Sequence, residues 1–437
     1  MGRPSRWPCD RALAQELPTC QKSNLDIVND KHTPRFRVFQ SCKCFYKNDQ
    51  QARGKQSLIP QVLHLFRSFS SKMSPSFSKL FVATSLVAAS FAGAAPLDQL
   101  EERSAKNHTI VKPKVIMDND WGTAGFIPYL MALDAGWDVL GLVSDTANSW
   151  ALQCGLHALA TLEVGNLSCI PVHKGADYPL LNTPELFQTW EMVHGKLAWE
   201  GSFAPENLTY EALGNDPTSG DPTRVSKAAL YEGYPNTTFA SKDAAWFMIQ
   251  QVRKYPGQVS IYSAGSLTNI ALAIRMDPDF AKNAKELVIM GGYIDDNLLQ
   301  VTGSVMQADW SSDVTIAGNV ANQVSVTQEY LDDIYKVKNP YSSLMHKYYG
   351  TIFPLWDETA AAIMLDPTIV KNITSFYLDV DTAPSSPNYG NIHAYQEALK
   401  PTAQNLQKVN MVVSIDGNRL KKWVKRAVQY PKSCSDF

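Results

Sequence analysis

Cysteine and histidine are scarce in this 437-residue chain once its first 72 residues are set aside. Four of the seven cysteines lie in residues 1–72, which leaves Cys154, Cys169 and Cys434. Three thiols allow at most one disulfide, and the sequence alone does not say which two pair. No Cys/His metal-ligand spacing follows residue 72, so a zinc site is not expected. His157 falls among leucines in an apolar helical pattern, where packing is expected rather than catalysis.

The chain also lacks a surplus of positive charge after its first segment. Residues 1–72 carry 13 Lys and Arg against 5 Asp and Glu, and the whole chain has a net charge of −2, so the remainder carries −10. Nucleic-acid binding relies on clustered Lys and Arg that neutralise phosphates. The acidic balance therefore argues against a nucleic-acid partner and is compatible with a neutral substrate or a bound cation.

A stable membrane span is not expected, because the one signal-like apolar run is short and rich in Ala and Ser. This run, residues 80–91, follows Lys79 and ends in small residues, which is the pattern of a secretory signal peptide at residues 73–95. Because signal peptides begin a chain, we expect translation to start at Met73. Residues 1–72 are then a leader that is absent from the natural, secreted product.

N-glycosylation sequons follow this segment. One N-x-[ST] match is weak, but five downstream of a signal peptide predict a secreted glycoprotein. The five asparagines are Asn107, Asn166, Asn207, Asn236 and Asn372.

Strand-like apolar runs alternate with helical patterns through much of the remaining chain. Strands are predicted near residues 115–117, 139–143, 170–172, 259–262, 286–290 and 314–317. Such alternation predicts an α/β fold, an open, mostly parallel sheet with helices on both faces. Residues 176–240 are predicted to form a loop-rich excursion over one end of the sheet. The C-terminal part is predicted to be helical, with a basic amphipathic stretch at 419–428, and residues 96–437 are taken as a single domain.

Two carboxylates stand where the first predicted strand ends. Asp118 and Asp120 flank Asn119 there, without a nearby Lys or Arg. Such a pair is costly unless it is protonated or bound to a cation, and oxygen ligands suit Ca²⁺ or Mg²⁺. Taken alone, the pattern is more simply a solvated acidic turn. In an open α/β sheet, however, ligands bind beyond the carboxyl ends of the strands.

Several motifs occur in the order found in one enzyme family. The chain resembles the inosine–uridine-preferring nucleoside hydrolases from about residue 114 to residue 366. The matches are the D-x-D-x-G start of the first motif at 118–122, a G-S-L-T-N-I-A turn at 265–271, a D-P pair at 277–278, V-I-M-G-G at 288–292, and a late W-D in place of H-D at 356–357.

The resemblance implies hydrolysis of the N-glycosidic bond of ribonucleosides by a water bound to Ca²⁺. It assigns Asp120 to the metal and to the role of general base, and Asp357 to the metal. Ala264 matches a position that offers its backbone carbonyl to the metal. Asn148 matches a ribose-binding asparagine, and Asp118 matches an aspartate that supports the substrate site.

The chain departs from the family pattern at several of these positions. Ala124 and Gly125 replace two aspartates, one that contacts ribose and one that binds the metal, and Trp356 replaces a histidine. Asp309 or Asp313 is the remnant of a ribose-binding acid, and the sequence does not decide between them.

Asp145, which follows the second predicted strand, is a candidate for the missing metal carboxylate. The simpler alternative is that Asp145 caps the helix that begins near Asn148. Six to eight oxygens are typical for Ca²⁺, and the surviving ligands reach only the lower end of that range.

Two functions remain open. The first is an extracellular ribonucleoside hydrolase that releases free base and ribose, with a small-molecule nucleoside as its partner. The second is a nucleoside- or sugar-binding protein on the same scaffold that has lost catalysis. The sequence leaves the preferred base open, and also whether the protein forms a homo-oligomer.

Overall fold

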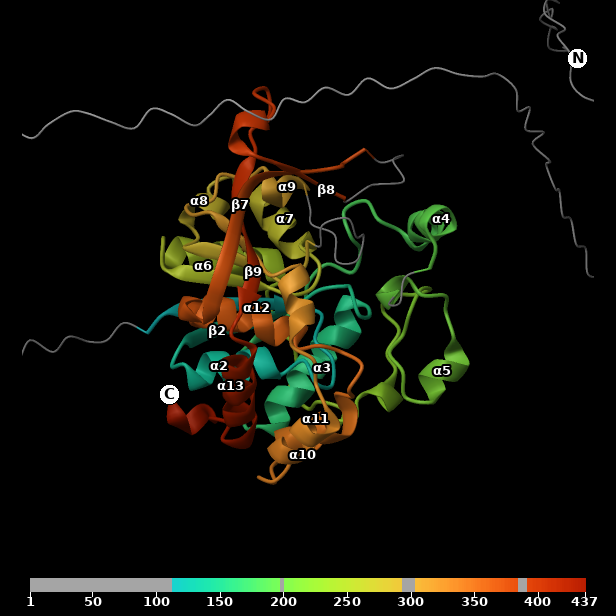
Figure 1. The fold of residues 1–437 in the computed structure, drawn as a ribbon. Helices are drawn as coiled ribbons and strands as arrows, with labels where there is room; N and C mark the ends of the chain where they lie inside the picture. Colours follow the sequence, from blue (N-terminus) through green and yellow to red (C-terminus); the bar gives the residue numbers. More distant parts are fainter. Residues whose placement is uncertain (1–111, 197–199, 293–302, 384–390) are drawn as a thin grey trace, which may run out of the picture. The chain divides into compact units, whose positions relative to one another are not determined.

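A nine-stranded sheet organises the part of the chain that the computed structural model describes, residues 112–196, 200–292, 303–383 and 391–437 (Figure 1). The predicted leader, the signal peptide and Asn107 lie outside these residues. The strand order is β3-β2-β1-β4-β5-β6-β9-β7-β8. The strands are β1 Lys114–Asn119, β2 Asp138–Ser144, β3 Val172–His173, β4 Val259–Ser263, β5 Glu286–Ile289, β6 Val314–Ile316, β7 Val370–Val380, β8 Ile392–Tyr395 and β9 Gln407–Ile415.

The first six strands are parallel to one another, and β9 is parallel to β6, which confirms the predicted open, mostly parallel sheet. The order runs outward from β1 in one direction to β3 and in the other from β4 to β6. Between β1 and β4 the winding of the chain therefore reverses. In sheets of this kind such a switch point opens a crevice at the carboxyl ends of the strands.

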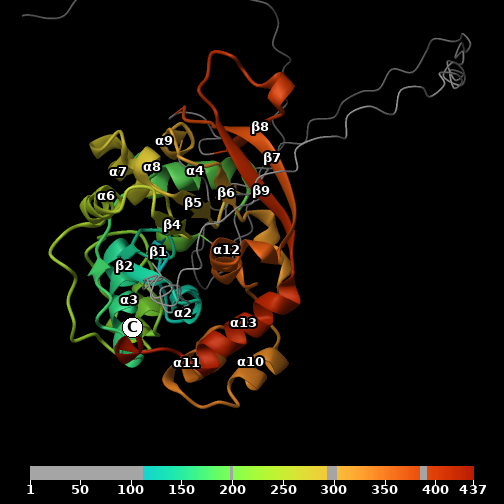
Figure 2. The same ribbon diagram turned by 90° about the vertical axis from the view of Figure 1, so that its left-hand side faces the viewer.

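Helices cover both faces of the sheet. They are α2 Ile127–Asp134, α3 Ala151–Val164, α6 Ala244–Lys254, α7 Thr268–Met276, α8 Phe280–Asn283, α9 Gly303–Met306, α10 Gln328–Ile334, α11 Pro340–Tyr348, α12 Trp356–Leu365 and α13 Gly417–Gln429. Figure 2 shows α6, α7 and α8 on one side and α2, α3 and α13 on the other. Alternate residues of β1 enter different cores, with Val115 and Met117 in one and Ile116 in the other.

The prediction of a helical C-terminal part is wrong for the described residues 370–380, 392–395 and 407–415. These residues form β7, β8 and β9, and β7 runs antiparallel to both of its neighbours. Much of β7 is exposed, and its central residues face solvent. Without a continuous buried run, its sequence carries little of the signal by which the parallel strands are recognised. The basic stretch at 419–428 is helical as predicted and lies within α13.

The excursion between β3 and α6 contains two helices that its composition did not indicate. They are α4 Pro184–His194 and α5 Leu208–Ala212, each begun by a side-chain cap, from Thr183 and Asn207. The excursion packs on the loop after β2, where Ser149 Oγ donates to the carbonyl of Pro217 at 2.6 Å. It thereby covers the carboxyl end of β2.

A disulfide joins Cys169, just before β3, to Cys434 near the end of the chain. This names the pair that the sequence left open, and Cys154 remains a buried free thiol. Within the described segments, every helix is too short or too polar to cross a bilayer.

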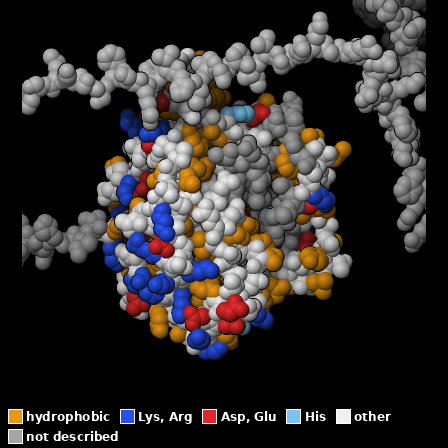
Figure 3. All heavy atoms as spheres, in the orientation of Figure 1, with side chains coloured by type: hydrophobic (Ala, Val, Ile, Leu, Met, Phe, Trp, Pro, Cys, Tyr) orange, Lys and Arg blue, Asp and Glu red, His pale blue; other side chains and the backbone are white. Residues whose placement is uncertain are grey.

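On the face shown in Figure 3, Lys and Arg side chains are interspersed with Asp and Glu. Three cations of α13 are paired in this way, because Arg419, Lys425 and Arg426 meet carboxylates of neighbouring elements.

Candidate active site

Carboxylates gather at the switch point between β1 and β4. Asp118 is the second-last residue of β1, and Asp120 directly follows the end of that strand. Asp145 comes directly after β2, and Ala264 directly after β4. Because these strands are parallel neighbours, the four residues share one edge of the sheet.

Asp118 is fully buried and held by an amide that we did not single out from the sequence. Asn269, at the start of α7, donates from Nδ2 to Asp118 Oδ1 at 3.0 Å and to the carbonyl of Ser144 at 3.0 Å. Its Oδ1 accepts from the backbone of Ala176 at 3.0 Å. Asn269 therefore ties the ends of β1 and β2 to the excursion. The signal was present, since Asn269 belongs to the matched turn at 265–271.

Asp120 is fixed by the residue that the resemblance assigned to ribose. The backbone N–H of Asn148 donates to Asp120 Oδ2 at 2.9 Å, and Asn148 Nδ2 donates to the Asp120 carbonyl at 3.1 Å. The Asn148 residue itself is exposed. Asp120 is 6% exposed, whereas Asp118 and Asp145 have no exposed surface. Of these three acids, Asp120 is thus the one that a substrate can reach.

Asp357 reaches the same place from α12. Asn119 Nδ2 donates to Asp357 Oδ2 at 3.0 Å, and the hydroxyl of Tyr262 on β4 donates to the Asp357 carbonyl at 3.1 Å. Asn119 stands in the middle of the first motif, but the sequence assigned it no role. Its side chain is the direct link between β1 and a residue 238 positions away.

Burial raises the pKa of all four carboxyl groups, and the charge of a neighbouring acid adds to this for Asp118, Asp120 and Asp145. Burial raises the pKa of Asp118 to about 7 and that of Asp357 to about 6. Burial, followed by the negative charge of Asp145, raises the pKa of Asp120 well above its ordinary value. Burial, followed by the charge of Asp118, does the same for Asp145. A cluster of this kind holds protons unless a cation or a substrate group compensates the charge.

Comparison with known proteins assigns the chain to a family. The model of the inosine-uridine preferring nucleoside hydrolases matches residues 115–422. This chain belongs to that family. The uncharacterized protein C800.11 of Schizosaccharomyces pombe is 33% identical over 341 residues, which cover 69% of this chain and 82% of that protein. The probable uridine nucleosidase 2 of Arabidopsis thaliana is 27% identical over 252 residues, 54% of this chain and 68% of that protein.

Solved structures show the same fold. A plant nucleoside hydrolase, PpNRh1, superposes with a TM-score of 0.56 at 20% sequence identity and covers 74% of this chain and 100% of its own. The low identities make this chain a divergent nucleoside hydrolase.

Two acids proposed for ribose lie away from the site of this nucleoside hydrolase. Asp313 directly precedes β6 and so lies at the amino-terminal edge of the sheet, opposite the carboxylate cluster. It contacts Lys408 Nζ and Asn410 Nδ2, each at 3.4 Å. Asp309 is exposed, two residues before Ser311, which donates to backbone carbonyls at the amino end of β5. Neither residue lies at the strand ends that carry the carboxylate cluster, because β6 begins, rather than ends, beside them.

The structure also shows whether Asp145 caps the helix after β2, which was the alternative to a place among the site carboxylates. The N-cap of α3 is Trp150, which makes no side-chain cap bond, and the N–H of Ala151 is satisfied by Thr146 Oγ1 at 2.9 Å. Asp145 Oδ1 instead accepts from the backbone N–H of Ser266 at 3.1 Å. Asp145 therefore belongs to the carboxylate cluster and does not cap the helix.

The chemistry of the cluster suits a hard cation. Within the described segments, no three Asp, Glu, His or Cys side chains form a complete metal-binding group. Three buried oxygens of the cluster nevertheless have no hydrogen-bond partner there: Asp118 Oδ2, Asn119 Oδ1 and Asp145 Oδ2. Buried polar atoms are rarely left unpaired, and carboxylate and amide oxygens are ligands that Ca²⁺ prefers. The residues present thus fit a calcium ion that also takes backbone and substrate oxygens.

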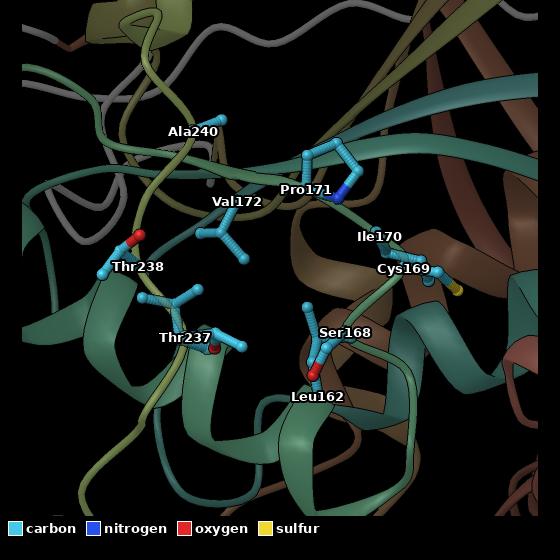
Figure 4. A pocket seen from close by; sticks show the side chains of 10 residues that line it. Leu162, Ser168, Cys169, Ile170, Pro171, Val172, Thr237, Thr238 and Ala240 are labelled. Carbon is cyan, nitrogen blue, oxygen red and sulfur yellow. The ribbon is translucent and has the colours of Figure 1, made fainter.

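A pocket of about 240 Å³ lies elsewhere, between α3 and the segments 168–172 and 237–240 (Figure 4). Its described lining is aliphatic with a few hydroxyls, among them Ser168, Thr237 and Thr238, and contains no acid or histidine. This pocket cannot supply a general base, so the carboxylate cluster remains the candidate active site.

Proposed function

We propose that this protein hydrolyses the N-glycosidic bond of ribonucleosides and releases free base and ribose. The observation that carries the proposal is the cluster of Asp118, Asp120, Asp145 and Asp357 at the switch point, in a member of the nucleoside hydrolase family. The similarity to the probable uridine nucleosidase 2 of Arabidopsis thaliana supports the same reaction.

In the proposed reaction a water attacks the anomeric carbon of the sugar. A carbon–oxygen bond forms, the carbon–nitrogen bond breaks, and the bonding electron pair leaves with the base. Asp120 accepts the proton of the water, since it is the acid of the β1 and β2 strand ends that retains exposed surface. Asn148 holds Asp120 in place through two hydrogen bonds. Asp118, clamped by Asn269, supports the strand end beside the sugar.

Calcium is the proposed cofactor. Asp120, Asp357 and the backbone carbonyl of Ala264 would hold it. When bound, the ion supplies positive charge that orients sugar hydroxyls and favours deprotonation of the attacking water. Its charge would also offset the repulsion that raises the pKa values of the cluster.

The test is release of reducing sugar from a panel of nucleosides, with calcium and with a chelator. Asp120→Asn keeps the size of the side chain but removes the proton acceptor, so we expect kcat to fall by roughly 10²–10⁴ while KM changes less. Asp313→Asn, at the opposite edge of the sheet, is the matched control and should retain the parent rate. A parent protein that turns over no nucleoside would refute the proposal.

One observation favours a second function, binding of nucleosides or sugars without turnover. Trp356 has no titratable group, and its Nε1 already donates to Asn322 Oδ1 at 2.7 Å. It therefore cannot protonate a departing base as the histidine expected there could. Equilibrium dialysis that detects nucleoside binding by a parent protein without sugar release would establish this alternative.

We propose further that the protein is a secreted glycoprotein. Disulfides persist in oxidising compartments, and the structure pairs Cys169 with Cys434. The four described sequon asparagines, Asn166, Asn207, Asn236 and Asn372, are all exposed and so open to a glycan.

A further inference from the structure

The side chain of Asp145 extends past the end of β1 to the chain that follows β4. It follows β2, which is a neighbour of β1 but not of β4. Its carboxylate nevertheless contacts the chain just beyond β4, where Ser266 N–H donates to Oδ1 at 3.1 Å. A methyl group added at Gly265 would lie 2.4 Å from both carboxylate oxygens. The Asp145 carboxylate therefore lies across the end of β1, next to the Ala264 backbone.

The second oxygen of this carboxylate receives no hydrogen bond from a backbone or side-chain donor among the described residues. Asp145 is fully buried, and this oxygen is Oδ2. The Oδ2 atom of Asp118 and the Oδ1 atom of Asn119 are left in the same state. The side chains of Asp118 and Asp145 also lie within hydrogen-bond reach of each other. Two buried carboxyl groups this close hold either a shared proton or a cation, and the unpaired Asn119 oxygen beside them is a further ligand for a cation.

The position where the family carries a metal carboxylate cannot accept one here. Gly125 N donates to the Gly122 carbonyl at 2.9 Å in a tight turn. A Cβ atom at Gly125 would lie 2.9 Å from the backbone nitrogen of Gly122, which is closer than real Cβ contacts allow. The backbone at this turn is thus shaped for glycine, and the charge has to come from elsewhere.

We propose that Asp145 is a direct ligand of the cation and takes the place of the carboxylate that is absent at position 125. The inference rests on the proposed calcium-dependent function. In this chain the ion would lie over the end of β1, bound from both sides by the residues that follow β2 and β4. This placement uses Asp145 Oδ2 as a ligand while Oδ1 remains anchored by Ser266.

The test is direct calcium titration by calorimetry of the full chain, independent of turnover. Asp145→Asn keeps an oxygen for the Ser266 N–H but loses the charge, and we expect calcium affinity to fall by more than about 100-fold. Asp177→Asn removes a carboxylate from the loop after β3, where it pairs with Lys174, and is the matched control with an expected change below about threefold. Melting curves recorded in chelator check that each variant is folded.

A second variant moves the carboxylate without removing it. Gly265→Ala would displace the Asp145 side chain, and we expect weaker calcium binding of similar size. If the parent binds calcium and both variants bind it within about threefold of the parent, Asp145 is not a ligand and the inference is overturned. A parent that binds no calcium would overturn the proposed cofactor as well, so the two failures are distinguishable.

Discussion

His157 has no proposed catalytic role, and its substitution tests whether the acids around it form a buried ion cluster. His157 on α3 is 1% exposed, and its ring contacts two acids of the excursion. Nε2 lies 2.9 Å from Asp216 Oδ1, and Nδ1 contacts Glu232, whose side chain is fully buried. With a carboxylate at each nitrogen, both nitrogens donate and the ring is an imidazolium. The sequence indicated ordinary packing here, and the structure corrects that expectation to a buried ion cluster.

We expect His157→Gln to destabilise the protein by about 3–5 kcal/mol, because Glu232 would be left as an unpaired buried charge. For a folded part of this size, a loss of about 0.7 kcal/mol in the free energy of unfolding lowers the melting temperature by about 1 °C. The melting temperature should therefore fall by about 4–7 °C. His346→Gln is the matched control. That histidine is partly exposed and lies 2.8 Å from the exposed Asp332, so its loss should cost less than about 1 kcal/mol.

The effect should depend on pH with a definite sign. The two carboxylates outweigh the opposing effect of burial and raise the pKa of His157 to about 10. A raised pKa stabilises the fold fully below the ordinary histidine pKa of about 6.5, and this stabilisation is lost as the pH rises to about 10. The gap in melting temperature between parent and His157→Gln should therefore be largest near pH 6 and shrink by pH 9.5. A gap that stays constant across this range would refute the assignment of charge to the cluster.

Three further predictions follow from the disulfide, the proposed metal and the proposed secretion. Cys169→Ser should lower stability by about 3–5 kcal/mol in thermal unfolding, since the bond closes a loop with a sequence separation of 265, whereas reductant should have no effect on that variant. Calcium at a hundredfold excess over Kd should stabilise the parent by about 2.7 kcal/mol, and Asp357→Asn should show no such shift. Protein from a secreting host should lose mass on enzymatic deglycosylation and begin near Ala95; an unglycosylated product that begins at Met1 would contradict secretion.

The sequence by itself determined the parallel half of the fold and pointed to the candidate site. Strands β1, β2, β4, β5 and β6 are buried on both faces, so their apolar runs are legible without knowledge of their partners. The order of motifs then placed acids after β1 and a turn after β4, and parallel strands bring such residues to one edge. In this way the sequence placed five residues at the candidate site: Asp118, Asp120, Asn148, Ala264 and Asp357.

The tertiary structure alone decided the features that depend on a distant partner. Strands β7 and β9 pair over half-exposed faces, so their sequence lacks a continuous apolar signal. The position of Asp313 at the amino-terminal end of β6 could not be predicted, because the local sequence does not say which end of that strand lies at the candidate site. The pairing of Cys169 with Cys434 requires a fold that brings together residues 265 positions apart. Asp145 reaches across β1 to the turn after β4, and only the packing of three strand ends could show that its carboxylate faces the other acids.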